Sequence, residues 1–250
     1  GQRDVPRPGG RARVRHPGVV RTYDYGESDG LYYLALEWAA GQSLADFLHQ
    51  SGPVAPALST EIITQLAAGL AAAHQVGIVH RDLKPENIIY DHATHVTKLL
   101  DFGIARDAEL PPEERLTRTG FFVGTLQYVA PEALSGELVD ARADIYSLAT
   151  IAYYMLTSHH PFSGRNPREL FQQLLKESPV RLNEVLPERR FPAGLEAAVM
   201  RGLSRNPAQR QDTVIGFAEE FFAGAADGAQ ASSSSGLLGT FRKFMGGKRD

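Results

Sequence analysis

The sequence has no cysteine, so disulfide bonds, thiolate metal centres and cysteine nucleophiles are excluded. It also has no run of about 20 predominantly apolar residues, the length that a helix needs to cross a bilayer. The longest stretches without acidic or basic residues, 62–79 and 145–164, contain polar side chains and are expected to form buried helices. No basic segment followed by an apolar one opens the chain, so we expect no secretory signal and a cytoplasmic location.

A large excess of one charge is missing too. The 26 Lys and Arg residues and 29 Asp and Glu residues give a formal net charge of −3. This balance argues against a surface dedicated to nucleic acid, although it allows a local basic patch. With 250 residues, 43% of them hydrophobic, the chain can bury a core of one large domain or two small ones. It begins with Gly1 rather than Met, which suggests a fragment or a processed chain.

The front of the chain combines a polar arm with a predicted hairpin. Residues 1–15 contain five arginines among prolines and glycines. This composition favours a flexible, solvated segment over one that binds nucleic acid. Segments 19–25 and 31–38 are rich in aromatic and β-branched residues and are separated by a short stretch of turn-forming residues. That pattern predicts a β-hairpin.

Most of the remaining chain is predicted to be helical. Apolar residues recur at helical spacing within 44–48 and 62–73, and Gly77 is placed to end the second helix. Asn166 is the expected N-cap of a later helix that starts with a proline. The later helices are predicted over 143–157, 167–177, 195–203 and 214–222.

The other segments differ in composition. Residues 78–103 suggest short strands among polar clusters, and 104–140 suggest a long functional loop. Residues 224–236 are rich in Gly, Ala and Ser, which predicts a linker. Residues 237–250 alternate apolar and basic side chains. We favour a frayed tail there over an amphipathic helix lying on a membrane.

Three short motifs follow one another in the middle of the chain. They are His80-Arg81-Asp82-Leu83-Lys84-Pro85-Glu86-Asn87, Asp101-Phe102-Gly103 and Ala130-Pro131-Glu132. Each tripeptide alone is weak evidence, but their order and spacing make a chance match rare. Over roughly residues 14–223 the sequence resembles the protein kinase superfamily. Lys84, Thr125 and a Thr-x-Thr segment make it similar to the Hanks-type serine/threonine kinases of bacteria.

The resemblance implies an α+β, protein-kinase-like fold with two lobes. Residues 41–223 would form a mostly helical C-terminal lobe, and 16–40 a truncated N-terminal lobe with a hairpin and a hinge. The implied reaction is transfer of phosphate from ATP, with Mg²⁺ as cofactor, to serine or threonine residues of protein substrates. The alternative is a pseudokinase-like scaffold or binding module. A kinase for small molecules is disfavoured because residues 124–132 resemble a platform for peptides.

The same resemblance implies catalytic roles. Asp82 is expected to orient the acceptor hydroxyl and receive its proton. Asn87 and Asp101 would offer hard oxygen ligands to Mg²⁺. Lys84 would place positive charge near the transferred phosphoryl group, and Thr125 would hydrogen-bond to the pair formed by Asp82 and Lys84.

Further matching positions are expected to support this site. Glu132 and Arg210 resemble a buried ion pair that fixes geometry. Asp144 resembles the helix residue that holds the backbone of the catalytic loop, with an exposed carboxylate near the helix start as the alternative. The backbone of Glu37 and Ala39, in the hinge-like segment 36–39, would bond adenine. Structural roles are also implied for His80, Arg81, Phe102 and Gly103.

Thr117 and Thr119 form the Thr-x-Thr segment between the second and third motifs. The resemblance implies an activation loop in which both are phosphorylated, with a kinase dimer as one route for transfer between copies. A phosphate there would pair with Arg81 and order the loop. The alternative is two solvated threonines.

The family pattern that should precede His16 does not occur in this sequence. No G-x-G-x-x-G motif is present there, and Lys84 is the first lysine of the chain. The helix-glutamate position falls near Arg7, between two prolines that disfavour a helix. Because these groups neutralise and cover the phosphates of ATP, we expect the 250 residues alone to bind ATP weakly and react slowly.

Overall fold

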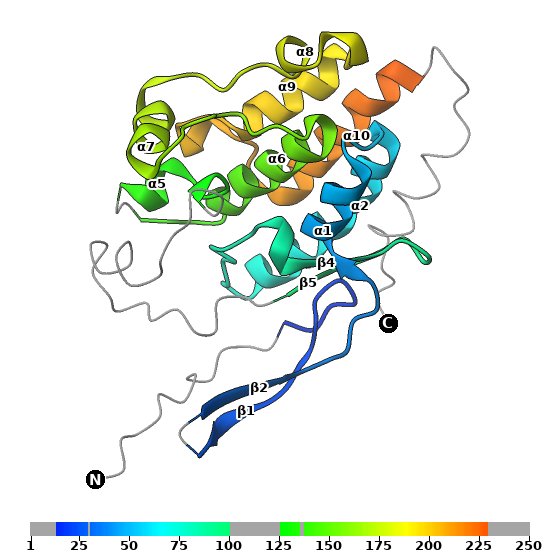
Figure 1. The fold of residues 1–250 in the computed structure, drawn as a ribbon, viewed down its shortest axis with the longest axis vertical. Helices are drawn as coiled ribbons and strands as arrows, with labels where there is room; N and C mark the ends of the chain where they lie inside the picture. Colours follow the sequence, from blue (N-terminus) through cyan, green and yellow to red (C-terminus); the bar gives the residue numbers. More distant parts are fainter. Residues whose placement is uncertain (1–13, 30, 101–125, 136–137, 230–250) are drawn as a thin grey trace.

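In the computed structural model, helices form a body at one end of the molecule and a hairpin extends from the other end (Figure 1). The structure describes residues 14–29, 31–100, 126–135 and 138–229. The strands are β1 (Thr22–Ser28), β2 (Leu31–Leu36), β3 (Gln42–Ser43), β4 (Ile88–Asp91) and β5 (Val96–Leu99). The α-helices are α1 (Leu44–Ser51), α2 (Pro56–Gln75), α5 (Pro131–Leu134), α6 (Arg142–Thr157), α7 (Pro167–Lys176), α8 (Leu182–Val185), α9 (Ala193–Gly202) and α10 (Val214–Ala229). Short 3₁₀ helices are η1 (Pro85–Asn87), η2 (Pro187–Arg189) and η3 (Pro207–Gln209).

Helix α6 lies at the centre of the helical body. It is buried on almost every side, with Ile145, Leu148, Ile151 and Leu156 fully shielded from solvent. Helices α2, α8, α9 and α10 pack against it. Each buried aliphatic side chain of this kind contributes roughly 1.5–3 kcal/mol to folding. None of the helices in the described ranges has the length and apolar character that crossing a membrane requires.

The predicted hairpin is present, but it starts later than the sequence pattern suggests. Strands β1 and β2 pair antiparallel, from Thr22 opposite Leu36 to Ser28 opposite Leu31. Val19 and Val20 belong to the body instead: both are buried, and the Val20 N–H donates to the Leu99 carbonyl over 2.9 Å. Burial against β5 therefore competes with strand pairing for these two β-branched residues.

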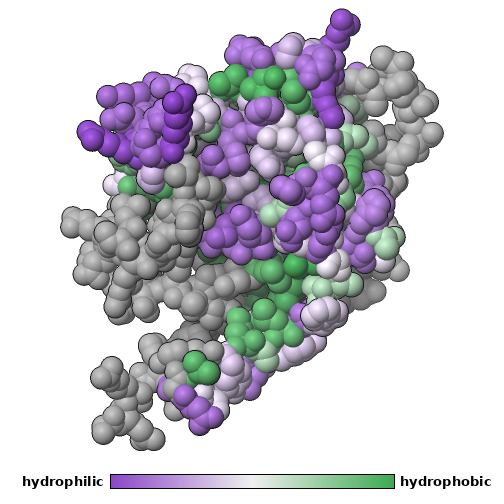
Figure 2. Space-filling model, in the orientation of Figure 1, coloured by the Kyte–Doolittle hydropathy of each residue, from purple (hydrophilic) through white to green (hydrophobic). Residues whose placement is uncertain are grey.

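The hairpin leaves apolar side chains in contact with solvent. Figure 2 shows hydrophobic residues gathered where the hairpin meets the body. Leu31 is 74% exposed, Leu34 40% and Trp38, just after β2, 92%. A two-stranded ribbon alone is marginally stable, so the hairpin depends on its attachment to the body.

The helix-end signals agree with the sequence analysis. Asn166 caps α7, since its side-chain oxygen accepts the Glu169 N–H over 2.9 Å. Gly77 follows α2 with a φ of 75°, a left-handed conformation that suits glycine at a helix end.

Helix α10 is longer than predicted and continues into the segment 224–236, which composition predicts to be a linker. Gly224 explains the difference. A Cβ added there would lie 2.3 Å from the Leu195 nitrogen, so α10 approaches α9 backbone to backbone. The glycine permits close packing here, and Ala225 beside it is buried.

Candidate active site

The loop of residues 80–87, between α2 and β4, brings three of the predicted site residues together. The Asn87 Nδ2 donates to the main-chain oxygen of Asp82 over 2.8 Å and to its Oδ2 over 3.2 Å. The Lys84 Nζ lies 3.5 Å from the same Oδ2. The Asp82 and Lys84 side chains are 19% and 18% exposed, so the cluster is open to a ligand on one side.

Asp144, from the first turn of α6, fixes the backbone of this loop. Its side chain is fully buried, and its two oxygens accept the N–H groups of His80 over 2.9 Å and of Arg81 over 3.0 Å. A third partner, His74 Nε2, lies 2.7 Å from Oδ2. Arg81 has a φ of 64°, a left-handed conformation that is costly for a side chain of its size. The hydrogen bonds to Asp144 hold the loop in that conformation.

His80 connects the loop to the strand that leads toward the second motif. Its Nε2 lies 3.0 Å from the Leu100 carbonyl, which can only accept, so Nε2 bears the proton. Its Nδ1 then accepts the Asp82 N–H over 3.4 Å. The Leu100 N–H in turn donates to the Asn87 carbonyl over 2.8 Å. The residue immediately before Asp101 is thus held to the loop through both of its main-chain groups.

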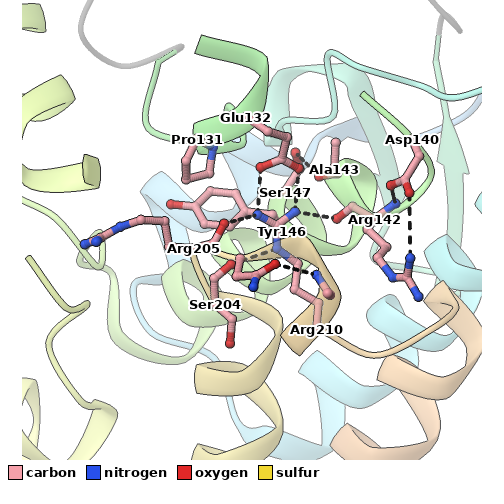
Figure 3. Close-up of polar contacts among 12 residues, drawn as sticks. Pro131, Glu132, Asp140, Arg142, Ala143, Tyr146, Ser147, Ser204, Arg205 and Arg210 are labelled. Atoms are coloured by element: carbon pink, nitrogen blue, oxygen red, sulfur yellow. Dashed lines mark hydrogen bonds and ion pairs between the residues drawn. The ribbon is translucent and has the colours of Figure 1, made fainter. Parts of the chain in front are cut away.

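Glu132 and Arg210 form a buried, two-pronged ion pair (Figure 3). The Arg210 Nη1 and Nη2 lie 2.6 and 2.8 Å from the two carboxylate oxygens. The same guanidinium also donates to the main-chain oxygens of Arg142, Ser204 and Arg205. The buried carboxylate and guanidinium are both fully hydrogen-bonded, so the pair fixes the position of α5 relative to α6 and η3.

The segment 36–39 is linked to the body through Glu37. Its carboxylate pairs with the Lys98 ammonium of β5 and accepts the Arg21 N–H over 3.1 Å. The hydrogen bond from Lys98, followed by the one from Arg21, lowers the pKa of Glu37 below its usual range. The Glu37 N–H donates back to the Arg21 carbonyl over 2.8 Å. Ala39 is half-buried beside this link.

The comparison with known families agrees with this arrangement. A family model described as the protein kinase domain matches residues 11–218. The chain belongs to the protein kinase family. The two-lobed, helix-rich kinase fold expected from the sequence is therefore the correct fold class.

Its relatives are bacterial serine/threonine kinases. The chain is 40% identical over 210 residues to the serine/threonine-protein kinase PknB of Mycolicibacterium smegmatis, covering 81% of this chain and 32% of PknB. It is 37% identical over 226 residues to the serine/threonine-protein kinase pkn2 of Myxococcus xanthus, covering 90% of this chain and 27% of pkn2. The chain therefore spans about a third of the length of these relatives.

Solved structures show the same fold. The crystal structure of Rad53 1–466 in complex with AMP-PNP superposes with a TM-score of 0.69 at 29% identity, covering 83% of this chain and 51% of that one. The kinase domain of Mycobacterium tuberculosis PknI gives a TM-score of 0.65 at 28% identity, covering 86% of this chain and 75% of that one.

Several predicted positions lie outside the described residues: Asp101, Phe102, Gly103, Thr117, Thr119 and Thr125. Within the described ranges, no three acidic or histidine side chains form a cluster that could hold a metal. Asn87 nevertheless fits the role of a Mg²⁺ ligand. Its amide nitrogen is used by Asp82, which leaves its hard oxygen Oδ1 for a cation.

Two residues that contact the predicted site residues could not be predicted from the sequence. His74 lies on α2 and Lys98 on β5, and each meets a partner more than 60 residues away in the chain. No local pattern marks such contacts. Lys98 does precede the second motif by three residues, and that spacing is the one available signal.

Proposed function

We propose that this chain forms most of the catalytic domain of an ATP-dependent kinase that phosphorylates serine and threonine residues of proteins. The observation that supports it most is the cluster of Asp82, Lys84 and Asn87 on a loop whose backbone is anchored to the core. Phosphoryl transfer depends mainly on positioning and on stabilising negative charge. This cluster offers a base, a cation and a hard oxygen ligand within one loop.

In the proposed reaction, a substrate hydroxyl attacks the γ-phosphorus of ATP and the bond to the ADP oxygen breaks. Asp82 orients the hydroxyl and receives its proton, while Asn87 holds the Asp82 carboxylate in place. Lys84 stabilises the charge on the transferred group. Asn87 and Asp101 would hold Mg²⁺, which supplies positive charge at the phosphates when bound. Thr125 would steady the Asp82 and Lys84 pair.

Other finer assignments belong to the same proposal. The backbone of Glu37 and Ala39 would bond adenine, at the segment tied to the body through Lys98. Phosphorylation of Thr117 and Thr119 would add negative charge that Arg81 pairs with, and transfer between two copies is the route we propose. We place this domain on the cytoplasmic side, with protein rather than nucleic acid as its partner.

The proposal is tested by replacing Asp82 in the full-length protein. Asp82→Asn keeps the size of the side chain but removes the base. We expect labelling of protein substrates from γ-labelled ATP to fall at least about 100-fold, with nucleotide binding retained. Asp212→Asn, the same change on an exposed side chain, is the matched control. Equal labelling by Asp82→Asn and the parent protein would refute the proposal.

A comparison of chain lengths separates the kinase from the scaffold alternative. A polypeptide limited to these 250 residues has no lysine before Lys84, so we expect slow transfer from it. The full-length protein is expected to label protein substrates at ordinary rates. A full-length protein that labels nothing but still binds partner proteins would favour the scaffold.

A further inference from the structure

Tyr128 is a buried side chain that the proposed chemistry does not use. It lies in the segment 126–130, between the position of Thr125 and helix α5, and is 6% exposed. Both of its ends are held. The Ser147 hydroxyl of α6 donates to the Tyr128 carbonyl over 2.7 Å, and the Tyr128 hydroxyl lies 3.2 Å from His160 Nε2.

His160 is itself placed with little freedom. The ring of Tyr154 stacks on it with centroids 4.7 Å apart, and the Tyr128 ring meets it edge-on at 5.4 Å. The turn before it is closed by Thr157, whose hydroxyl accepts the His159 N–H over 3.0 Å. The imidazole is therefore held in one orientation, with Nε2 directed at the Tyr128 hydroxyl.

The environment of His160 keeps its ring neutral. Burial, followed by the neighbouring His159, lowers the pKa of His160 to about 4. Burial also raises the pKa of Tyr128, and the negative charge of Glu86 contributes in the same direction. The ring of Tyr154 adjoins the pair, and His159 and Glu86 act on it through their charges. Near neutral pH the hydrogen bond therefore joins two uncharged partners.

Glu86 also relates this pair to the site. It is an exposed residue on the loop 80–87, next to Asn87, and its charge acts on Tyr128. Asp144, which anchors the loop 80–87, and Ser147, which holds the Tyr128 carbonyl, are three residues apart on α6, so the two segments are fixed to neighbouring positions of one helix. A polypeptide that presents a hydroxyl to Asp82 would therefore approach the loop 80–87 beside this segment.

We propose that His160 is a positioning residue for the protein substrate, because it fixes Tyr128 and thereby the segment 126–130 beside the loop of Asp82. The inference rests on the proposed function. It assigns His160 a role in peptide binding and none in the binding of ATP. Removing the imidazole leaves the Tyr128 hydroxyl buried without its partner, which is costly, so the segment is expected to shift.

Steady-state kinetics on the full-length protein test this role. His160→Leu removes the hydrogen bond at similar volume, and Tyr128→Phe removes its other half. Both are expected to raise the KM for a threonine peptide about tenfold, with the KM for ATP unchanged. His160→Gln, which can still hydrogen-bond, is expected to remain within about threefold of the parent protein. The double variant His160→Leu/Tyr128→Phe should be no worse than either single change.

Unchanged peptide KM in His160→Leu would overturn the inference. A rise in both KM values together with a fall in kcat, not rescued by His160→Gln, would also overturn it, because that pattern indicates a general folding defect.

Hydrogen exchange supplies a readout that needs no activity: amides 126–130 should exchange faster in His160→Leu, and amides 80–87 should not. If this happens in a protein that labels no substrate, the proposed function is wrong and the positioning of Tyr128 stands. If the exchange rates stay the same in an active kinase, the positioning role is wrong.

Discussion

The loop 80–87 belongs to the helical body, whereas the hairpin formed by β1 and β2 extends away from it, and the two are held in different ways (Figure 1). The loop is fixed by buried polar groups, above all by the Asp144 carboxylate. The hairpin exposes much of its apolar surface, and its link through Glu37 and Lys98 is partly open to solvent. The loop is thus built into the core, whereas the hairpin is attached to it by partly exposed contacts.

This contrast predicts where substitutions should affect stability most. An interaction that is buried and fully partnered leaves an uncompensated charge or a cavity when one member is removed. An exposed interaction is replaced by water at little cost.

Breaking the buried ion pair should be the most damaging change. Glu132→Gln keeps the shape of the side chain but leaves the Arg210 guanidinium buried without a counter-charge. We expect a loss of about 3–5 kcal/mol in the free energy of unfolding, measured by urea denaturation. Asp212→Asn breaks the exposed pair with Arg142 and should cost less than about 1 kcal/mol. Similar losses in the two variants would contradict the contrast.

Two leucines compare the apolar contacts of the body and the hairpin. Leu70 of α2 is 0% exposed and Leu34 of β2 is 40% exposed. Leu70→Ala creates a cavity and should cost about 2–5 kcal/mol. Leu34→Ala should cost less than about 1 kcal/mol. Thermal unfolding of both variants checks the prediction, and a large loss in Leu34→Ala would show that the hairpin is packed more firmly than its exposure indicates.

Low pH should lower the free energy of unfolding through protonation of His160. The pKa of its ring is about 4 in the folded protein, against an ordinary value of 6.5. Between pH 4 and pH 6.5 the unfolded chain therefore binds a proton at this ring that the folded chain does not bind. Stability therefore falls as the pH drops from 6.5 toward 4, by at most about 3 kcal/mol from this group. It is unaffected above pH 7. Urea denaturation across this range should show a shallower pH dependence in His160→Gln, and parallel curves would contradict the assignment.

Lys98, which pairs with the segment 36–39, is expected to give the mildest effect. Lys98→Met removes the ammonium that pairs with Glu37, and both side chains are partly exposed. We expect a stability loss of no more than about 1 kcal/mol, together with a rise of the Glu37 pKa toward its ordinary value. An NMR titration of the carboxyl carbons measures that rise. An unchanged Glu37 pKa would mean that the Arg21 N–H, rather than Lys98, accounts for the shift.

Much of the fold could be predicted because its signals are local. The hairpin follows from two β-rich segments around a turn, and the start of α7 follows from Asn166 and Pro167. The three motifs likewise identified the family, since their spacing can be counted along the chain. The predicted site residues Asp82 and Asn87 also lie within one loop, where sequence distance is a good guide to contact.

What could not be predicted depends on contacts between distant segments. Nothing near His74 indicates that it reaches Asp144, 70 residues later. Val19 and Val20 are β-branched residues typical of a hairpin strand, but they are buried in the core, where Val20 is hydrogen-bonded to β5. His160 follows α6 in a turn and has no local feature that indicates its pairing with Tyr128. In each case burial, which the sequence pattern does not specify, decides the partner.

The close approach of α9 and α10 at Gly224 has a practical consequence for anyone who shortens this chain. Composition places a boundary near residue 223, yet the last turns of α10 are pressed against the start of α9. Truncation at residue 223 would remove those turns and expose the apolar surface that they cover. A stable, soluble fragment should therefore retain the chain through Ala229.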